Sequence, residues 1–375
     1  MDNLIRIEEV KDKKGFNQFL KFPYKLFKDD KMWVPSLIMD EKTTFNKKKN
    51  PALEFCDHKI FLAYRGEELV GRIVGILNNK ANEIWNQKRM RFGWFDYIDD
   101  IEVTEALLKA VEDWSKEKGM DEVVGPMGFT DMDKEGMMVE GFDVNCPIAC
   151  YYNPSYYSPL IEKLGYVKEV DWVQYEIPAN QPVPEKISKI NNLIKAKYNL
   201  KIVEGLSKKE IVNLYGKKIF HVVNKSFAGL FGYVPLNDRQ IDFYISQYFS
   251  FIEPRLVCFI VDEKDDVVAF GVSMPSLSDA LRKSKGKLFP FGWYHLLKAL
   301  KNYSYIDLYI NGVDPDWQNK GVHSLYYVEM NKRYIELGAK MAIANPQLES
   351  NQASQIWEKY ESRIAIRRRA YIKQI

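Results

Sequence analysis

The sequence predicts a mixed α/β fold made of two α+β domains in tandem, each with a mixed sheet covered by helices. The chain has 375 residues, more than one typical domain of about 150 residues. Near its middle, three prolines lie within seven residues, a composition that precludes a helix or a central strand. The same order of strands and helices follows on both sides. We therefore place a first domain at 1–177, a linker at 178–186 and a second domain at 187–375.

In the first domain, apolar residues alternate or recur at helical spacing in an order that begins and ends with a strand. Gly119 and Gly165 stand where two helices should end. The expected elements are a strand at 4–10, a helix at 15–28, a hairpin with strands at 61–64 and 69–77, a helix at 104–118, a strand at 122–125, a helix at 156–164 and a strand at 167–177.

The second domain repeats this order, although its residues do not recognisably repeat those of the first. The expected elements are a strand at 201–204, a helix at 208–225, a hairpin with strands at 256–261 and 267–273, a strand at 305–313, a helix at 323–337, a strand at 340–344, a helix at 351–361 and a strand at 368–373. Strands interleaved with helices in this way are typical of a mixed sheet covered by helices.

The composition excludes several classes of protein. A formal net charge of +3 spread along the chain is too small for a nucleic-acid interface, so we expect no nucleic-acid partner. Four cysteines without a CxxC pair predict no metal site. No secretory signal and no apolar run of about 18 residues is evident, so we expect a cytoplasmic protein without an integral membrane segment. A monomer and a homodimer both remain open.

The sharpest local pattern joins the strand at 305–313 to the helix at 323–337. Gln318, Gly321 and His323 stand at the start of that helix, whose exposed amides and dipole would attract an anion. Glycine at 321 allows positive φ and a close approach of the backbone to a pyrophosphate, and Lys320 adds charge. The alternative is an ordinary glycine-containing turn that begins a helix.

This pattern resembles the Q/R-x-x-G-x-G/A pyrophosphate loop of the GNAT acyltransferases, except that His323 replaces the usual Gly or Ala. The resemblance implies acyl-CoA as co-substrate and no metal. The residues that it assigns to acyl-CoA are Gly312, Val313, Gln318, Asn319, Lys320, Gly321, Val322, His323 and Asn351. In that superfamily a tyrosine of the last helix often protonates the leaving thiolate. Here the usual position falls nearest Trp357, so Tyr360 is the candidate, one turn out of place.

A second resemblance extends over almost the whole chain. It rests on several short motifs, among them Trp33-Val34-Pro35, Gly125-Pro126-Met127, the run from Glu135 to Asp143 and Asn153-Pro154-Ser155-Tyr156-Tyr157. Together these motifs resemble a YghO-like bacterial family of two-domain GNAT-like acyltransferases. One branch of that family is similar to bacterial ceramide synthases, which acylate a long-chain amine from acyl-CoA. The resemblance therefore implies a small-molecule amine or lipid-like acceptor, and it leaves peripheral membrane contact open.

The chemistry of amine acylation needs a base for the ammonium proton. Candidate bases are Asp307, His323, Glu349, Glu140 and Asp143. Asp307 could equally be a solvated strand residue. Glu140 and Asp143 lie in a long segment, 129–153, that we interpret as a loop closing over an apolar acceptor.

Two further features qualify this picture. Arginines 367–369 could contact anionic lipid or the phosphates of CoA, or form a solvated strand face. The first domain carries no glycine and three acids at 98–103, where an anion should bind, so we expect that it has lost CoA binding and shapes the acceptor pocket. Two alternatives remain: a catalytically silent pair that binds acyl-CoA or a partner protein, and a Fem-type aminoacyl transferase, which would need a basic groove.

Overall fold

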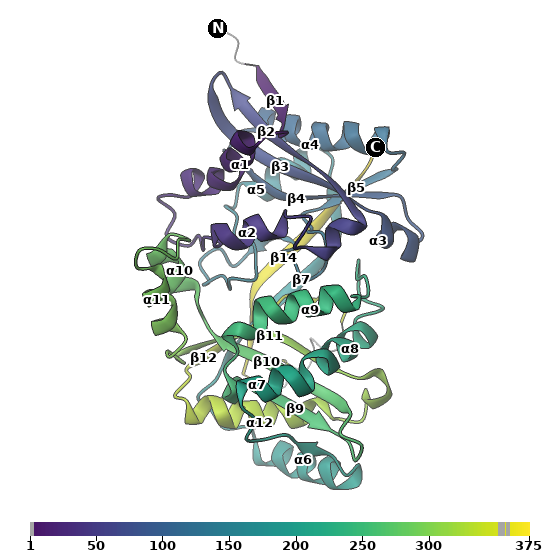
Figure 1. Cartoon of the computed structure of the whole chain (residues 1–375), viewed down its shortest axis with the longest axis vertical. Coiled ribbons are helices and arrows are strands. Elements are labelled where there is room, and N and C mark those ends of the chain that lie inside the picture. The colour runs from purple at the N-terminus through teal and green to yellow at the C-terminus, as the bar shows by residue number, and fades with distance from the viewer. Residues whose placement is uncertain (1–3, 352–356, 358–360) are drawn as a thin grey trace.

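The computed structural model describes residues 4–351, 357 and 361–375. Within this part of the chain, one 14-stranded mixed sheet runs through the whole molecule, with helices on its faces (Figure 1). Its main path follows the order β1-β2-β3-β4-β5-β14-β7-β12-β11-β10-β9-β8, while β6 pairs with β14 and β13 pairs with β7. The mixed α/β fold class predicted from the sequence is confirmed.

The N-terminal half forms the upper part of the molecule in Figure 1. Its strands are β1 (Ile5–Glu9), β2 (Cys56–Arg65), β3 (Glu68–Asn78), β4 (Arg89–Tyr97), β5 (Glu122–Gly125), β6 (Met137–Glu140) and β7 (Val167–Pro178). Its helices are α1 (Lys13–Leu26), α2 (Ile38–Thr44), α3 (Asn79–Ile84), α4 (Ile101–Glu117) and α5 (Tyr157–Lys163). Helix α4 covers β3 because small glycines there, Gly71 and Gly75, admit the side chains of Leu107 and Trp114.

The C-terminal half forms the lower part. Its strands are β8 (Lys201–Ile202), β9 (Val257–Val261), β10 (Val267–Pro275), β11 (Tyr305–Val313), β12 (Met341–Ala344), β13 (Gln347–Leu348) and β14 (Arg363–Gln374). Its helices are α6 (Glu185–Lys197), α7 (Lys208–Glu210), α8 (Gly216–Ser226), α9 (Asp238–Tyr248), α10 (Ser278–Ser284), α11 (Gly292–Ala299) and α12 (His323–Glu336), with a π-helical turn at Ile211–Tyr215. Most of the helix expected at 351–361, including Tyr360, lies outside the described residues.

The last strand of each half lies beside the other half. Strand β7 pairs antiparallel with β12, and β14 returns from the C-terminus to pair with β5. The two exchanged strands also pair with each other along most of their length. The sheet is therefore continuous across the seam between the halves, and each half includes one strand contributed by the other.

The arginines of β14 are held inside the protein. Arg368 is fully buried, and its guanidinium donates to the side-chain oxygen of Gln174 at 2.7 Å and to Sγ of Cys146 at 3.2 Å. Arg369 donates to the buried carboxylate of Asp171 at 2.8 Å. Both interpretations of this run, as a lipid or CoA contact and as a solvated face, are wrong for Arg368, because the exchange of strands places β14 at the centre of the sheet.

Candidate functional site

Two neighbouring parallel strands of the C-terminal half diverge at the middle of β11. The pairing of β11 with β12 runs from Tyr305 opposite Met341 to Leu308 opposite Ala344. Strand β12 ends there, whereas β11 continues to Val313 beside β10. The register of β10 and β11 also shifts at this point, since Ile310 and Leu308 face consecutive residues of β10 and leave one extra residue between them. Such a bulge bends its strand and opens the sheet.

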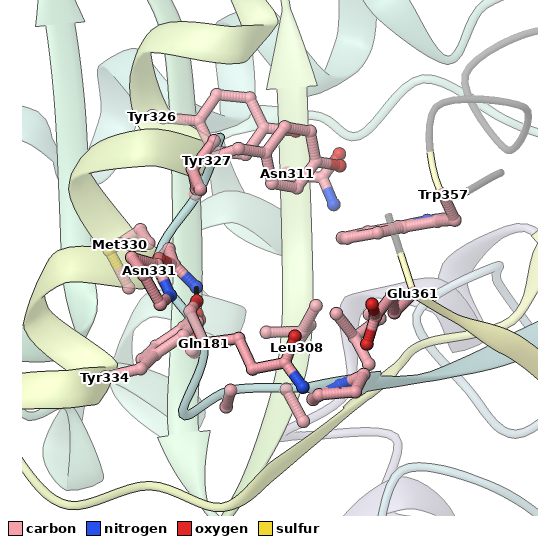
Figure 2. Close-up of a pocket in the computed structure, with 18 of the residues that line it drawn as sticks. Gln181, Leu308, Asn311, Tyr326, Tyr327, Met330, Asn331, Tyr334, Trp357 and Glu361 are labelled. Atoms are coloured by element: carbon pink, nitrogen blue, oxygen red, sulfur yellow. Dashed lines mark hydrogen bonds between the residues drawn. The ribbon is translucent and has the colours of Figure 1, made fainter. Parts of the chain in front are cut away.

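A largely apolar cavity of about 190 Å³ lies over this opening. Strands β10 and β11 form its floor, α12 forms one wall, and the proline-rich segment at 177–184 forms another. Figure 2 shows side chains from these elements converging, with Trp357 and Glu361 at one side. The side chains that matter below are Leu308, Tyr326, Tyr327, Met330, Asn331, Tyr334 and Trp357. An apolar cavity with a few polar groups is the usual form of a small-molecule site.

The polar groups at this cavity have defined partners. The hydroxyls of Tyr334 and Ser273 are 2.6 Å apart, and burial raises the pKa of Tyr334. The side-chain amide of Asn331 donates to the carbonyl of Gln181 at 3.1 Å, which ties α12 to the proline-rich segment. The ring of Trp357 meets that of Tyr327 edge to face at 4.7 Å. Trp357 thus lies at the cavity, while its neighbour Tyr360 lies outside the described residues.

The turn predicted to bind an anion lies just before α12. Asn319 and Gly321 both have positive φ, at 60° and 77°. Among the described residues, the backbone amides of 319–322 have no hydrogen-bond acceptor. The ammonium group of Lys320 lies over the indole ring of Trp317 at 4.8 Å, and Gln318 turns back to donate to the carbonyl of Val313 at 3.3 Å. The turn therefore offers several amide donors beside one cation.

Helix α6 packs against this turn, which the sequence did not indicate. A Cβ on Gly321 would lie 2.7 Å from Cδ1 of Ile194, and Asn191 donates to the carbonyl of Ser324 at 2.9 Å. The side of Gly321 that lacks a Cβ therefore faces α6. Glycine is required here by its φ and by the helix contact, a reason that differs from the expected close approach to a pyrophosphate.

Asp307 lies on the face of β11 opposite the cavity. Its side chain is 1% exposed, and neither carboxylate oxygen makes a hydrogen bond of good geometry within the described structure. Burial raises the pKa of this carboxyl to about 7, and the hydroxyl of Ser276 only partly offsets that rise. The interpretation of Asp307 as a solvated strand residue is wrong, because 146–152 and α10 cover this face of β11.

The other predicted acids lie elsewhere. Glu140 and Glu349 both pair with Arg367, and Glu349 also pairs with Lys168 at 3.2 Å. Its bond from Arg367 is the main reason that the pKa of Glu349 is lowered. Asp143 is exposed. The segment at 129–153 is also more regular than predicted, since β6 within it pairs with β14.

In the N-terminal half, the helix start that corresponds to that of α12 is the N-terminus of α4, and Asp100 caps it. The carboxylate of Asp100 accepts from the amide of Glu102 at 2.9 Å and pairs with Arg65 at 2.6 Å. A carboxylate already satisfies the positive end of α4. That the first half does not bind CoA stays a prediction.

Gly312, Val313, Val322 and His323, which were also assigned to acyl-CoA, adjoin the turn along the chain. Gly312 and Val313 end β11, and Gly312 packs against the ring of Phe270. Val322 is buried in the core beneath α12, and His323 begins that helix. Asn351 follows β13 at the edge of the described chain. Sequence reasoning did not identify the tyrosines of α12 or the residues of 177–184 that line the cavity, because they belong to no local motif.

A sheet with this order and a divergent strand pair defines the chain as a tandem GNAT protein in fold. It is similar to a solved tandem GNAT protein from the clavulanic acid biosynthesis pathway, with a TM-score of 0.56 and 8% identity over 99% of this chain and 98% of that one. It is also similar to a GCN5-related N-acetyltransferase from Sphaerobacter thermophilus, with a TM-score of 0.52 and 10% identity over 99% and 95% of the two chains.

Two curated relatives extend the similarity to sequence. The chain is 27% identical to Protein YghO of Escherichia coli (strain K12) over 77% of this chain and 73% of that protein. It is 27% identical to the bacterial ceramide synthase of Caulobacter vibrioides (strain NA1000 / CB15N) over 78% and 75% of the two chains. No family model matches the chain. The resemblance to YghO-like two-domain GNAT proteins that the motifs indicated is confirmed.

Two features are absent from the part of the chain that the structure describes. None of the helices in this part of the chain is long and apolar enough to cross a membrane. Nor do three or more His, Cys, Asp or Glu side chains gather there in a way that could hold a metal ion.

Proposed function

We propose that this protein is an acyl-CoA-dependent N-acyltransferase of the GNAT type that transfers an acyl group to an amine. The observation that carries the proposal is the apolar cavity over the opening between β11 and β12, close to the unpaired amides of residues 319–322. An amide-rich turn at a helix start suits a pyrophosphate, and an apolar cavity suits an acyl chain and its pantetheine arm. One donor could therefore occupy both.

In this scheme, the chain's own groups hold the two ends of the donor. Amides of 319–322 and the ammonium of Lys320 would bind the pyrophosphate, with the dipole of α12 adding to the attraction. Gln318 and His323 flank this turn, and Gly312 and Val313 end the strand before it. Asn351 stays a predicted contact of acyl-CoA. The tyrosines of α12 and Trp357 would enclose the acyl arm.

The reaction joins the amine nitrogen to the thioester carbon and breaks the carbon–sulfur bond. A backbone amide at the bulge of β11 would stabilise the oxyanion. The ammonium proton needs an acceptor, and the leaving thiolate needs a proton. Asp307, with its pKa raised to about 7, suits the first role near neutral pH, directly or through water. Tyr360 stays the candidate for the second role. Glu349 and Glu140 are weaker candidates because both pair with Arg367, and Asp143 is weaker because it is exposed.

We further propose a long-chain or lipid-like amine as the acceptor, and the N-terminal half, 1–177, as the part that shapes its site. A ceramide is an N-acylated long-chain amine, so the name of the Caulobacter relative supports this acceptor class. Asp307 and Tyr309 face the N-terminal half from the side of β11 opposite the donor cavity. The amine would then meet the thioester at β11, with donor and acceptor on its two sides.

Two measurements test the proposal. Thermal-shift titrations with CoA, acetyl-CoA and palmitoyl-CoA should show stabilisation of about 2.7 kcal/mol at a hundredfold excess over Kd. Release of CoA thiol should then depend on an added amine, tested with short and long-chain amines. Binding without amine-dependent release would favour a catalytically silent acyl-CoA binder. No stabilisation by any thioester would refute the proposal.

A matched pair of variants locates the donor site. Asn331→Trp places a large ring at the rim of the cavity and should abolish stabilisation by palmitoyl-CoA. Asn192→Trp makes the same change on the exposed face of α6 and should leave it intact. Gly321→Glu is a poor test, since its side chain would displace Ile194 and α6.

A further inference from the structure

A cluster of exposed aromatic and apolar side chains lies on α11 and on the segment that precedes it. Within nine residues the chain exposes Phe289 at 77%, Phe291 at 70%, Trp293 at 46%, Tyr294 at 54% and Leu297 at 53%. We call these five side chains the aromatic patch. A soluble protein exposes single apolar residues commonly, but a contiguous cluster of this kind marks an interaction surface.

The packing of α11 keeps the side chains of the patch on the surface. Leu296, next to Leu297, is only 8% exposed and packs with Leu281, Leu277 and Met274 in a small core. The indole Nε1 of Trp293 donates to the carbonyl of Pro290 at 2.9 Å, so its polar group is satisfied without a water partner. Helix α11 therefore has one face in the core and one face that has no partner within the described chain.

The segment that carries the patch has charges of one sign only. From 280 to 306 the sequence contains no Asp or Glu. Its cations are Arg282, Lys283, Lys285, Lys287, Lys298 and Lys301. Arg282 pairs with Asp279, whereas the five lysines are exposed and none pairs with a carboxylate in the described structure. Aromatic side chains ringed by lysines are the composition of a surface that enters the headgroup region of an anionic membrane.

The patch also lies beside the candidate acceptor face. Helices α10 and α11 lie at the edge of the molecule, level with the seam between the halves (Figure 1). Gly286 packs against Ser36 and Tyr24 of the N-terminal half, and Ser278 donates to the carbonyl of Cys146 at 2.8 Å. The core beneath the patch includes Tyr309, the extra residue of the bulge on β11. An amphiphile leaving a membrane here would arrive close to Asp307.

We propose that the aromatic patch docks the protein on the surface of an anionic lipid bilayer. A second copy of this chain fits the patch less well, because a two-fold contact would bring the same lysines of both copies together. A bilayer with anionic headgroups satisfies both the apolar side chains and the lysines. Membrane docking goes beyond the proposed function and does not depend on it. Only the idea that docking delivers a lipid-like amine to the enzyme rests on the proposed function.

Vesicle sedimentation with the full chain tests the docking. Vesicles of phosphatidylcholine with about a quarter phosphatidylglycerol should pellet the wild-type chain, and pure phosphatidylcholine should pellet much less. The triple variant Phe289→Ser/Phe291→Ser/Leu297→Ser should bind the anionic vesicles at least tenfold more weakly. Its thermal midpoint should stay near wild type, since the three side chains are exposed. Lys283→Glu/Lys287→Glu should weaken binding by roughly tenfold or more at low salt.

The matched control is Val167→Ser/Leu193→Ser/Leu214→Ser, which removes three equally exposed apolar side chains elsewhere and should bind like wild type. Equal binding by the patch variant and the wild-type chain would overturn the proposal. So would a wild-type chain that ignores vesicles but forms a dimer that the patch variant loses, because the occupant would then be a second copy. Acylation of a water-soluble amine is measured separately, so failure of the proposed enzyme activity and failure of docking give different results.

Discussion

Replacing Asp307 with asparagine should remove a loss of stability that the wild-type chain undergoes between about pH 4 and pH 8. Burial raises the pKa of Asp307 from 3.8 to about 7. Above about pH 4 the unfolded chain releases this proton while the native chain keeps it, so the free energy of unfolding falls with rising pH until the native carboxyl also ionises near 7. The difference in pKa corresponds to a stabilisation on the order of 4 kcal/mol, which is present in full at low pH and lost by pH 8.

Urea denaturation at several pH values measures this loss. The Asp307→Asn curve should lack the fall, whatever constant change the buried amide adds. Asp113→Asn, at an exposed site where an i,i+4 pair contributes only a few tenths of a kcal/mol, should keep the wild-type pH dependence. If Asp307 is also the base, kcat/KM of the wild-type enzyme should rise through about pH 7. Parallel stability curves for Asp307→Asn and wild type would refute the reasoning, because Asp307 would then ionise normally.

Three further outcomes follow from the contacts of single side chains and one strand. Arg368→Ala should lower the free energy of unfolding by about 3 kcal/mol in urea, since it leaves buried acceptors without a donor, whereas Arg363→Ala on the exposed end of β14 should lower it by less than about 1 kcal/mol. Glu349→Gln should change kcat by less than about twofold, because its two basic partners hold it ionised; a tenfold loss would make it the base. Deletion of 363–374 should give an insoluble chain, as β5 and β7 both lose a partner; a soluble, cooperatively melting product would contradict this.

Elements with a strong local pattern could be predicted from the sequence. The strand expected at 305–313 has the same bounds as β11, and the helix expected at 323–337 differs from α12 by one residue. Alternating apolar residues and the glycine at 338 are sufficient signals there. The exchange of β7 and β14 could not be predicted in this way, since the pairing joins residues such as Glu176 and Arg363 that are 187 apart. No local signal in either strand selects its partner.

The candidate site could be predicted only where it has a motif. The turn at 318–323 was found through its glycine and its place between a strand and a helix. The burial of Asp307 could not be inferred, because alternation along β11 assigns side chains to faces without saying that both faces are covered. The exposed aromatic patch was also missed. The sequence analysis predicts no element at 288–300, and only the structure shows that Leu296 points inward while Leu297 points outward.

The exchanged strands also explain why the proline-rich segment borders the candidate donor cavity. Strand β7 pairs with β12. The last residues of β7, Ile177 and Pro178, therefore lie opposite Ala342 and Met341 in the sheet of the C-terminal half. The amide of Ala179 continues this pairing by donating to the carbonyl of Lys340 at 3.0 Å. The segment therefore leaves the sheet at the cavity, and its prolines make it a stiff wall that faces α12. We propose that 178–186, expected as a linker, has this second role, so that a ligand in the cavity would contact both halves of the duplicated fold at once.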